Sequence, residues 1–125
     1  MSKRCLVVED NAINQTVITG ILQALDLAVT VAGNGVEALE CVEGNSFDII
    51  MMDLQMPLMD GLEATSRMRA LGGWCATVPI IAVTANPDML TDPHKGIAEG
   101  FTGVIPKPID PRALAHVLLE HLPPD

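Results

Sequence analysis

Five short runs of apolar residues alternate with stretches of helical periodicity along almost the whole chain. The runs are rich in Val and Ile and apolar at successive positions, which is typical of parallel strands buried on both faces. Strands that alternate with helices predict right-handed crossovers and an α/β sandwich of three layers. The predicted strands are residues 4–8, 28–32, 47–52, 79–83 and 102–105.

The stretches between and after these strands predict helices. Asn11 is a predicted N-cap, and Asp110-Pro111 combines a capping acid with proline at the first helical position. The predicted helices are residues 12–25, 35–43, 61–71 and a last one from Asp110-Pro111 to about His121. Residues 87–99 contain two prolines and a glycine, and proline inside a helix costs about 3 kcal/mol. We therefore expect a short or broken helix from about 88 to 98, or a helical turn followed by a loop.

Length and composition limit the classes of protein. The 125 residues suffice for one domain, predicted over 1–125 with its core at about 3–122. Without a run of about 18 apolar residues or a signal-peptide core, we expect no membrane contact and a cytoplasmic location. The net charge of −9 argues against direct nucleic-acid binding. Three cysteines without a C-x-x-C pattern argue against a disulfide framework or a zinc site, and Cys75 is expected to be exposed.

Polar side chains stand at the ends of four of the predicted strands. Glu9 and Asp10 follow the first, Asp53 the third, Thr84 the fourth and Lys107 the fifth. The carboxyl ends of parallel strands meet at one edge of the sheet, where such folds bind their ligands. We therefore expect these five side chains to gather at one site.

Three carboxylates in one place require a cation. Two unit charges 4 Å apart repel by about 1 kcal/mol in water and about 4 kcal/mol at an effective dielectric near 20. Mg²⁺ is the best candidate, because it is held by one or two carboxylates together with waters and phosphate oxygens. Lys107 and Thr84 suit a phosphoryl group, and Asp53 is the predicted nucleophile, since carboxylates accept phosphoryl groups as acyl phosphates.

These residues make the chain similar to the receiver domains of two-component response regulators, from about residue 3 to 122. The resemblance implies the flavodoxin-like, doubly wound fold with strand order 2-1-3-4-5. The phrases around Asn11, Asn14 and Met56–Gly61 look most like the receiver domains of hybrid histidine kinases and phosphorelays. The motifs are Val8-Glu9-Asp10-Asn11, Met52-Asp53, Met56-Pro57-Leu58-Met59-Asp60-Gly61, Thr84-Ala85 and Lys107-Pro108.

The resemblance also implies which residues bind the metal. Asp53 is the phosphoacceptor and a Mg²⁺ ligand. Asp10 is a direct ligand, and Glu9 acts mainly through water. The backbone carbonyl of Gln55 completes the protein ligands.

The remaining implied roles concern the phosphoryl group. Lys107 pairs with it, Thr84 is the switch hydroxyl that moves toward it, and the Ala85 amide is a further donor. The bond from Lys107 to Pro108 is expected to be cis. Members of the family usually carry Tyr or Phe where this chain has Val104, so Thr84 and the loop behind it are expected to carry the signal.

The predicted function is that of a signalling phosphoacceptor, a monomer that takes a phosphoryl group from a histidine kinase or a histidine phosphotransfer protein. It is not otherwise an enzyme, although it can promote its own phosphorylation and dephosphorylation. The alternative is a Mg²⁺-dependent phosphohydrolase with an aspartyl nucleophile, but such enzymes of the haloacid dehalogenase type need an acid where Gln55 stands. An FMN-binding module would need a glycine-rich phosphate cradle in place of Glu9-Asp10-Asn11. A receiver used only as a scaffold would not need the intact acids, Thr84 and Lys107.

Overall fold

A parallel sheet of five strands forms the centre of the protein in the computed structural model, which describes residues 3–56, 58–87, 90–92, 96–97 and 100–122. Across the sheet the order is β2-β1-β3-β4-β7, which is the predicted order 2-1-3-4-5 of a doubly wound fold. The strands are β1 (Arg4–Val8), β2 (Ala28–Ala32), β3 (Ile49–Asp53), β4 (Ile80–Thr84) and β7 (Gly103–Pro106).

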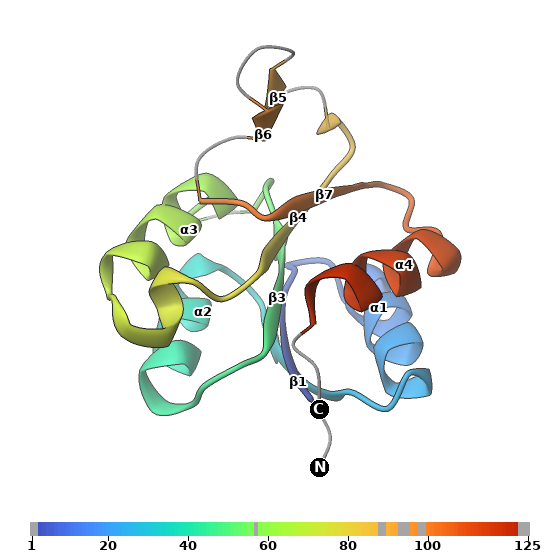
Figure 1. The fold of residues 1–125 in the computed structure, drawn as a ribbon, viewed down its shortest axis with the longest axis horizontal. Helices are drawn as coiled ribbons and strands as arrows, with labels where there is room; N and C mark the ends of the chain where they lie inside the picture. Colours follow the sequence, from blue (N-terminus) through green and yellow to red (C-terminus); the bar gives the residue numbers. More distant parts are fainter. Residues whose placement is uncertain (1–2, 57, 88–89, 93–95, 98–99, 123–125) are drawn as a thin grey trace.

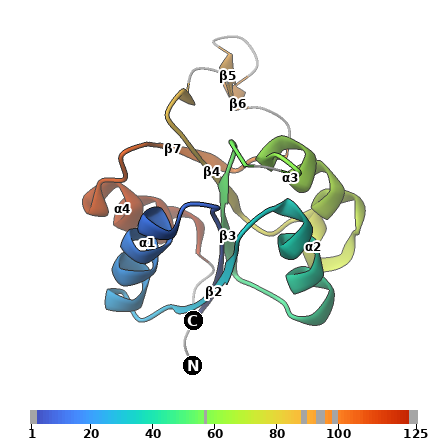
Figure 2. The same ribbon diagram turned by 180° about the vertical axis from the view of Figure 1, so that it is seen from behind.

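Helices cover both faces of the sheet, which confirms the three-layer sandwich (Figure 1). Two of them, α1 (Ala12–Ala24) and α4 (Pro111–His121), lie on one face. The other two, α2 (Gly35–Gly44) and α3 (Gly61–Ala70), lie on the opposite face, as the view from behind in Figure 2 also shows. Each face has its own apolar cluster, so the central strands are buried on both sides.

Side-chain caps fix where the helices begin. Asn11 accepts a hydrogen bond from the N–H of Asn14, and Asp110 accepts one from the N–H of Arg112, so both predicted caps are confirmed. Each such cap contributes about 1 kcal/mol. Helix ends differ from the predictions by one residue. Strand β3 begins two residues later than predicted, and β4 and β7 begin one residue later. All three end one residue later than predicted, so Asp53 and Thr84 are the last residues of their strands.

The predicted helix from about 88 to 98 is wrong for the described part of that segment, whereas the alternative of a turn agrees with the N–H of Leu90, which donates to the Pro87 carbonyl at 3.1 Å. Two short antiparallel strands, β5 (Thr91–Asp92) and β6 (Gly96–Ile97), pair there. They project beyond β4 and β7 in Figure 1. The physical reason lies in the sequence, because proline and glycine oppose a helix while Thr91 and Ile97 are β-branched residues that favour strands. Residues 88–89, 93–95 and 98–99 lie outside the described residues.

A partly buried side chain of α3 anchors this connection. The guanidinium of Arg69 on α3 donates to the carbonyl of Gly100 through Nε at 3.0 Å and Nη2 at 2.6 Å. Its Nη1 donates to the carbonyls of Cys75 and Val78. Thus one side chain ties the return to β7 to the 3-10 turn η1 (Gly73–Ala76). Cys75 is buried in this turn, so the expectation of an exposed thiol is wrong.

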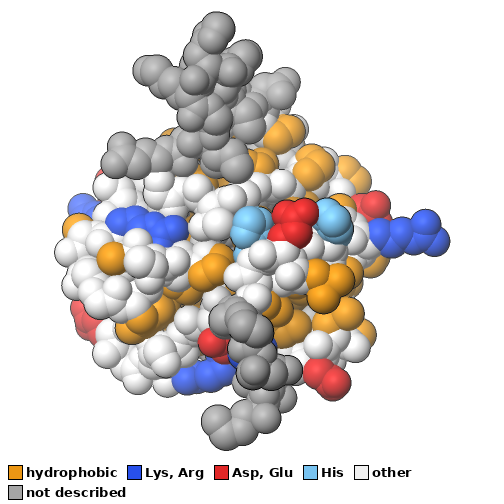
Figure 3. Space-filling view, in the orientation of Figure 1, with side chains coloured by type: hydrophobic (Ala, Val, Ile, Leu, Met, Phe, Trp, Pro, Cys, Tyr) orange, Lys and Arg blue, Asp and Glu red, His pale blue; other side chains and the backbone are white. Residues whose placement is uncertain are grey.

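The described surface carries charges of both signs. On the face in Figure 3, the Lys and Arg side chains of the described residues lie as separate spots and form no continuous basic area. Among the described residues, no helix is long and apolar enough to cross a bilayer.

Candidate metal centre

Three carboxylates meet at the carboxyl edge of the sheet, as the sequence predicts. Glu9 and Asp10 follow β1, and Asp53 ends the neighbouring strand β3. One ligand oxygen from each of the three lies within 4.8 Å of the others. Glu9 and Asp53 are buried, whereas Asp10 is exposed. The cluster therefore has a buried floor and an open side.

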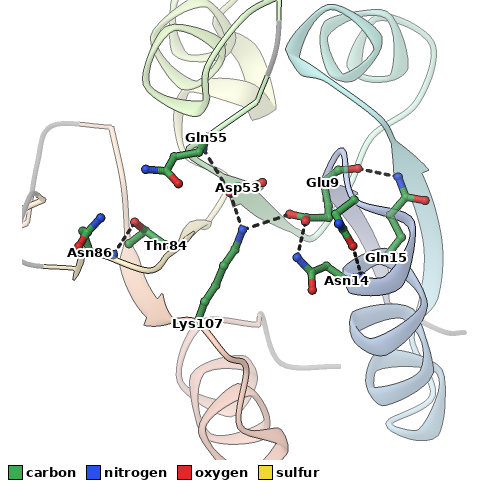
Figure 4. Close-up of polar contacts among 9 residues, drawn as sticks. Glu9, Asn14, Gln15, Asp53, Gln55, Thr84, Asn86 and Lys107 are labelled. Carbon is green, nitrogen blue, oxygen red and sulfur yellow. Dashed lines mark hydrogen bonds and ion pairs between the residues drawn. The ribbon is translucent and has the colours of Figure 1, made fainter.

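The Asp53 carboxylate is held by one oxygen only. Its Oδ1 accepts hydrogen bonds from the Lys107 ammonium at 3.0 Å and from the backbone N–H of Gln55 at 3.2 Å (Figure 4). Its Oδ2 is buried and has no hydrogen-bond partner in the described structure. A buried carboxylate oxygen without a partner is costly, so this atom is available to a cation or to an electrophile.

Backbone packing explains the glycine beyond Asp53. The N–H of Gly61, the first residue of α3, donates to the carbonyl of Leu54 at 3.2 Å. A Cβ at Gly61 would overlap the carbonyl oxygen of Asp53 and come within 2.9 Å of Leu54. Only glycine lets α3 begin this close to the strand end. Asp60 caps the same helix by accepting from the N–H of Glu63.

Glu9 is fixed by two amide side chains of α1. Asn14 Nδ2 donates to Glu9 Oε1 at 2.8 Å, and Gln15 Nε2 donates to the Glu9 backbone carbonyl at 2.6 Å. No motif of the sequence predicted a role for either amide. Their position in the sequence could have indicated a contact with Glu9, because the first turn of the helix is the part nearest to the acid at the strand end.

Burial changes the protonation of Glu9. Its side chain is 1% exposed. Burial raises the pKa of this carboxyl to about 7, and neighbouring Asp53 adds to the rise. The hydrogen bond from Asn14 and the charge of Lys107 act in the opposite direction. With its pKa raised to about 7, the Glu9 carboxyl is partly protonated near neutral pH.

Lys107 is the fixed positive charge of the site. Its Nζ lies 3.0 Å from Asp53 Oδ1 and 3.8 Å from Glu9 Oε2, so the ammonium stands between the two buried acids. Figure 4 shows it reaching them from the loop after β7. The peptide bond from Lys107 to Pro108 is cis, as expected.

The cluster fits a hard divalent cation. Three carboxylates face one ammonium, and two buried oxygens, Glu9 Oε2 and Asp53 Oδ2, have no hydrogen-bond partner in the described structure. An all-oxygen donor set with an open side for water is the kind of site that Mg²⁺ prefers.

Thr84 and Ala85 lie at the end of β4. Thr84 is buried, and its hydroxyl accepts the N–H of Asn86 at 3.0 Å. It lines a pocket of about 340 Å³ together with Gln55. Ala85 is exposed. Val104 on β7 is partly buried against the apolar cluster.

Comparison with known proteins agrees with this geometry. Residues 5–119 match the family model described as the response regulator receiver domain. The chain is 41% identical over 119 residues to "Two-component system protein A" of Emericella nidulans, covering 93% of this chain but only 17% of that protein. It is 37% identical over 125 residues to hybrid signal transduction histidine kinase I of Dictyostelium discoideum, of which it spans 7%. The chain therefore corresponds to a small part of these longer relatives.

Solved structures are similar over nearly the whole chain. The receiver domain of sensor histidine kinase PA1611 from Pseudomonas aeruginosa, solved with a magnesium ion coordinated in its active-site cleft, is 34% identical. It superposes with a TM-score of 0.84 over 97% of this chain and 98% of that one. The receiver domain of Ssk1 of Saccharomyces cerevisiae, crystallised with the histidine phosphotransfer protein Ypd1, is 30% identical with a TM-score of 0.83. That match covers 96% of this chain and 88% of the other.

Proposed function

The chain belongs to the response regulator receiver family, the phosphoacceptor domains of two-component phosphorelays, and from this premise we propose that Asp53 is its phosphoacceptor. The state of the Asp53 carboxylate carries the proposal. Its Oδ1 is held by Lys107, while its Oδ2 is buried and without a hydrogen-bond partner among the described residues. One oxygen is therefore oriented and the other remains available for a new bond.

The proposed transfer is a displacement at phosphorus. An oxygen of Asp53 forms a bond to phosphorus while the P–N bond of the donor phosphohistidine breaks. The electron pair of that bond stays with the imidazole nitrogen, which takes up a proton from solvent. Phosphoryl transfer of this kind needs positioning and charge neutralisation rather than further covalent chemistry.

The residues around Asp53 have distinct parts in this proposal. Mg²⁺, held by Asp10, Asp53 and the Gln55 carbonyl with Glu9 acting mainly through water, would supply positive charge to the phosphoryl oxygens. Lys107 exchanges its contact with the Asp53 carboxylate for a contact with the phosphoryl group. Because the ammonium already lies 3.0 Å from the carboxylate, this exchange needs only a small movement.

Thr84 and Ala85 act after the transfer. The Thr84 hydroxyl turns toward the phosphoryl group by a change of χ1 rotamer, which ends its hydrogen bond with the N–H of Asn86. The Ala85 amide is a further donor to the same group. Val104 has a stiff β-branched side chain, so we place the signal in the loop after Thr84 rather than in a rotating ring.

The donor docks, in this proposal, on the rim beside α1. Ile13 and Val17 on α1 are 74% and 46% exposed, and Leu58 in the loop beyond Asp53 is 83% exposed. Val17 also lines a pocket of about 150 Å³ with Lys107 and Pro108. Apolar side chains gathered near a polar site favour a protein partner, here a histidine kinase or a histidine phosphotransfer protein.

Stoichiometric labelling tests the proposal. A small phosphodonor with Mg²⁺ is expected to label the wild-type chain with one phosphoryl group, released by hydroxylamine as an acyl phosphate is. Asp53→Asn should abolish the label. Asp26→Asn is the matched control, because Asp26 has a positive φ of 66° that asparagine also adopts.

Two results would contradict the proposal. One is a label on Asp53→Asn equal to that on the wild type. The other is repeated turnover of phosphoesters without a stable label, which would favour the phosphohydrolase alternative.

A further inference from the structure

The Glu9 carboxylate is buried but only half of its hydrogen-bonding capacity is used. Its Oε1 accepts from Asn14 Nδ2 at 2.8 Å. Its Oε2 has no hydrogen-bond partner in the described structure, and the Lys107 ammonium lies 3.8 Å away. With the side chain 1% exposed, bulk water does little to orient either oxygen. Among the described residues, the amide of Asn14 is therefore the one hydrogen-bond donor to the carboxylate.

Asn14 is itself well anchored. Its backbone N–H donates to the side chain of Asn11, the cap of α1, at 3.0 Å. The next residue, Gln15, holds the backbone carbonyl of Glu9. Figure 4 shows both amides reaching back from α1 to the strand end. The first turn of the helix thus fixes the backbone of Glu9 through one amide and its carboxylate through the other.

We propose that Asn14 is a positioning residue of the metal site: by holding Glu9 Oε1, it keeps Oε2 directed at the divalent cation and its water shell instead of at Lys107. This inference rests on the proposed function of the same site. The terminal torsion of a glutamate is broad, so it does not fix the carboxylate by itself. If the Asn14 donor were lost, the carboxylate would turn toward the ammonium 3.8 Å away.

This rotation of the Glu9 carboxylate would weaken the metal site in two ways. The cation would lose an oxygen directed at it, and Lys107 would be drawn away from Asp53, its nearer partner at 3.0 Å. Outer partners that orient metal ligands are typically worth about 10–100-fold in metal affinity. The proposal therefore predicts weaker Mg²⁺ binding without a direct contact between Asn14 and the metal.

A purely structural role for Asn14 can be separated from this one. The cap of α1 uses the backbone N–H of Asn14, which any substitution except proline retains. Asn14→Leu keeps the branched shape of the side chain, favours the helix and removes the side-chain donor. Thr16→Ala is the matched control, because the Thr16 hydroxyl donates to the Ala12 carbonyl within the same helix and does not contact Glu9.

The test is isothermal titration of Mg²⁺ into the metal-free wild type and both variants, with melting temperatures measured in parallel. We expect the Kd of Asn14→Leu to rise about tenfold or more and that of Thr16→Ala to stay within about twofold. Asn14→Ala serves as a second variant if Asn14→Leu does not fold. In the labelling of Asp53, the Mg²⁺ concentration for half-maximal rate should rise, while the rate at saturating Mg²⁺ stays within about twofold of the wild type.

An unchanged Kd in a folded Asn14 variant would overturn the inference. So would a lower labelling rate at saturating Mg²⁺ together with a lower melting temperature, since that combination indicates a general loosening of α1. The proposed function fails separately, if the wild type binds Mg²⁺ but Asp53 takes up no phosphoryl group. In that case the Kd comparison still decides the role of Asn14.

Discussion

In the metal-free protein, stability should fall as the pH rises from about 4.5 to about 7, because Glu9 keeps its proton in the folded state. The pKa of this carboxyl rises from 4.5 to about 7 on folding, mainly through burial. Between these values the folded chain binds more protons than the unfolded chain, so the free energy of unfolding decreases with pH. The contribution is fully present below about pH 4.5 and is lost once the pH passes about 7.

The size of this loss follows from the same pKa. Each tenfold change in proton affinity is worth about 1.4 kcal/mol, so a rise from 4.5 to about 7 corresponds to about 3 kcal/mol. The Glu9 side chain is 1% exposed, so solvent screens little of this effect. Domains of this size are stable by about 5–15 kcal/mol, so the loss is measurable. Mg²⁺ at about 100 times its Kd would restore about 2.7 kcal/mol.

Urea unfolding with a chelator, at several values from about pH 5 to about pH 8, measures the effect. Glu9→Gln is the reference, because glutamine keeps an oxygen for the Asn14 hydrogen bond but does not titrate. The wild type should lose stability relative to Glu9→Gln as the pH rises, and excess Mg²⁺ should remove most of the difference. Parallel pH profiles of the two proteins in chelator would refute the reasoning.

Three further substitutions test other parts of the structure. Arg69→Met removes four hydrogen bonds to backbone carbonyls and should lower the free energy of unfolding in urea by about 2–4 kcal/mol. The control Arg67→Met breaks an exposed ion pair with Glu63 and should lower it by less than about 1 kcal/mol. Equal losses for the two variants would contradict the anchoring role of Arg69. Gly61→Ala should lower the free energy of unfolding by about 1–3 kcal/mol, because the new Cβ meets the backbone at the end of β3. Gly20→Ala, at a position of α1 where a Cβ meets nothing, should raise it by about 0.5–1 kcal/mol. The same sign for both variants would contradict the packing argument. Lys107→Met removes a positive charge that competes with the cation, so it should tighten Mg²⁺ binding in a titration. The same variant should slow the labelling of Asp53. Weaker Mg²⁺ binding would contradict the electrostatic role of Lys107.

Much of the site follows from where residues stand along the chain. A parallel sheet brings the carboxyl ends of its strands to one edge, so Glu9, Asp10, Asp53 and Lys107 could be predicted to meet without any knowledge of side-chain contacts. Their distances bear this out for the three acids and the lysine. Local capping chemistry likewise predicted the start of α1 at Asn11.

The remaining features depend on tertiary contacts that no local pattern contains. The connection from β4 to β7 was expected to contain a short or broken helix, or a helical turn followed by a loop, and no local pattern predicted that Thr91 pairs with Ile97. Where it returns to the sheet, the carbonyl of Gly100 accepts a hydrogen bond from Arg69, a residue on α3 that is distant in sequence. The amide of Asn14 looked like an ordinary polar residue of a helix, because its bond to Glu9 depends on how α1 leaves the sheet.

Transfer from a phosphohistidine to this chain is the decisive measurement. A phosphorylated histidine phosphotransfer protein is mixed with the chain in Mg²⁺, and the modified peptide is mapped by mass spectrometry. We predict one phosphoryl group per chain on Asp53, lost with a chelator and absent from Asp53→Asn. A phosphoryl group on any other residue, or transfer that continues unchanged in Asp53→Asn, would contradict the role proposed for Asp53.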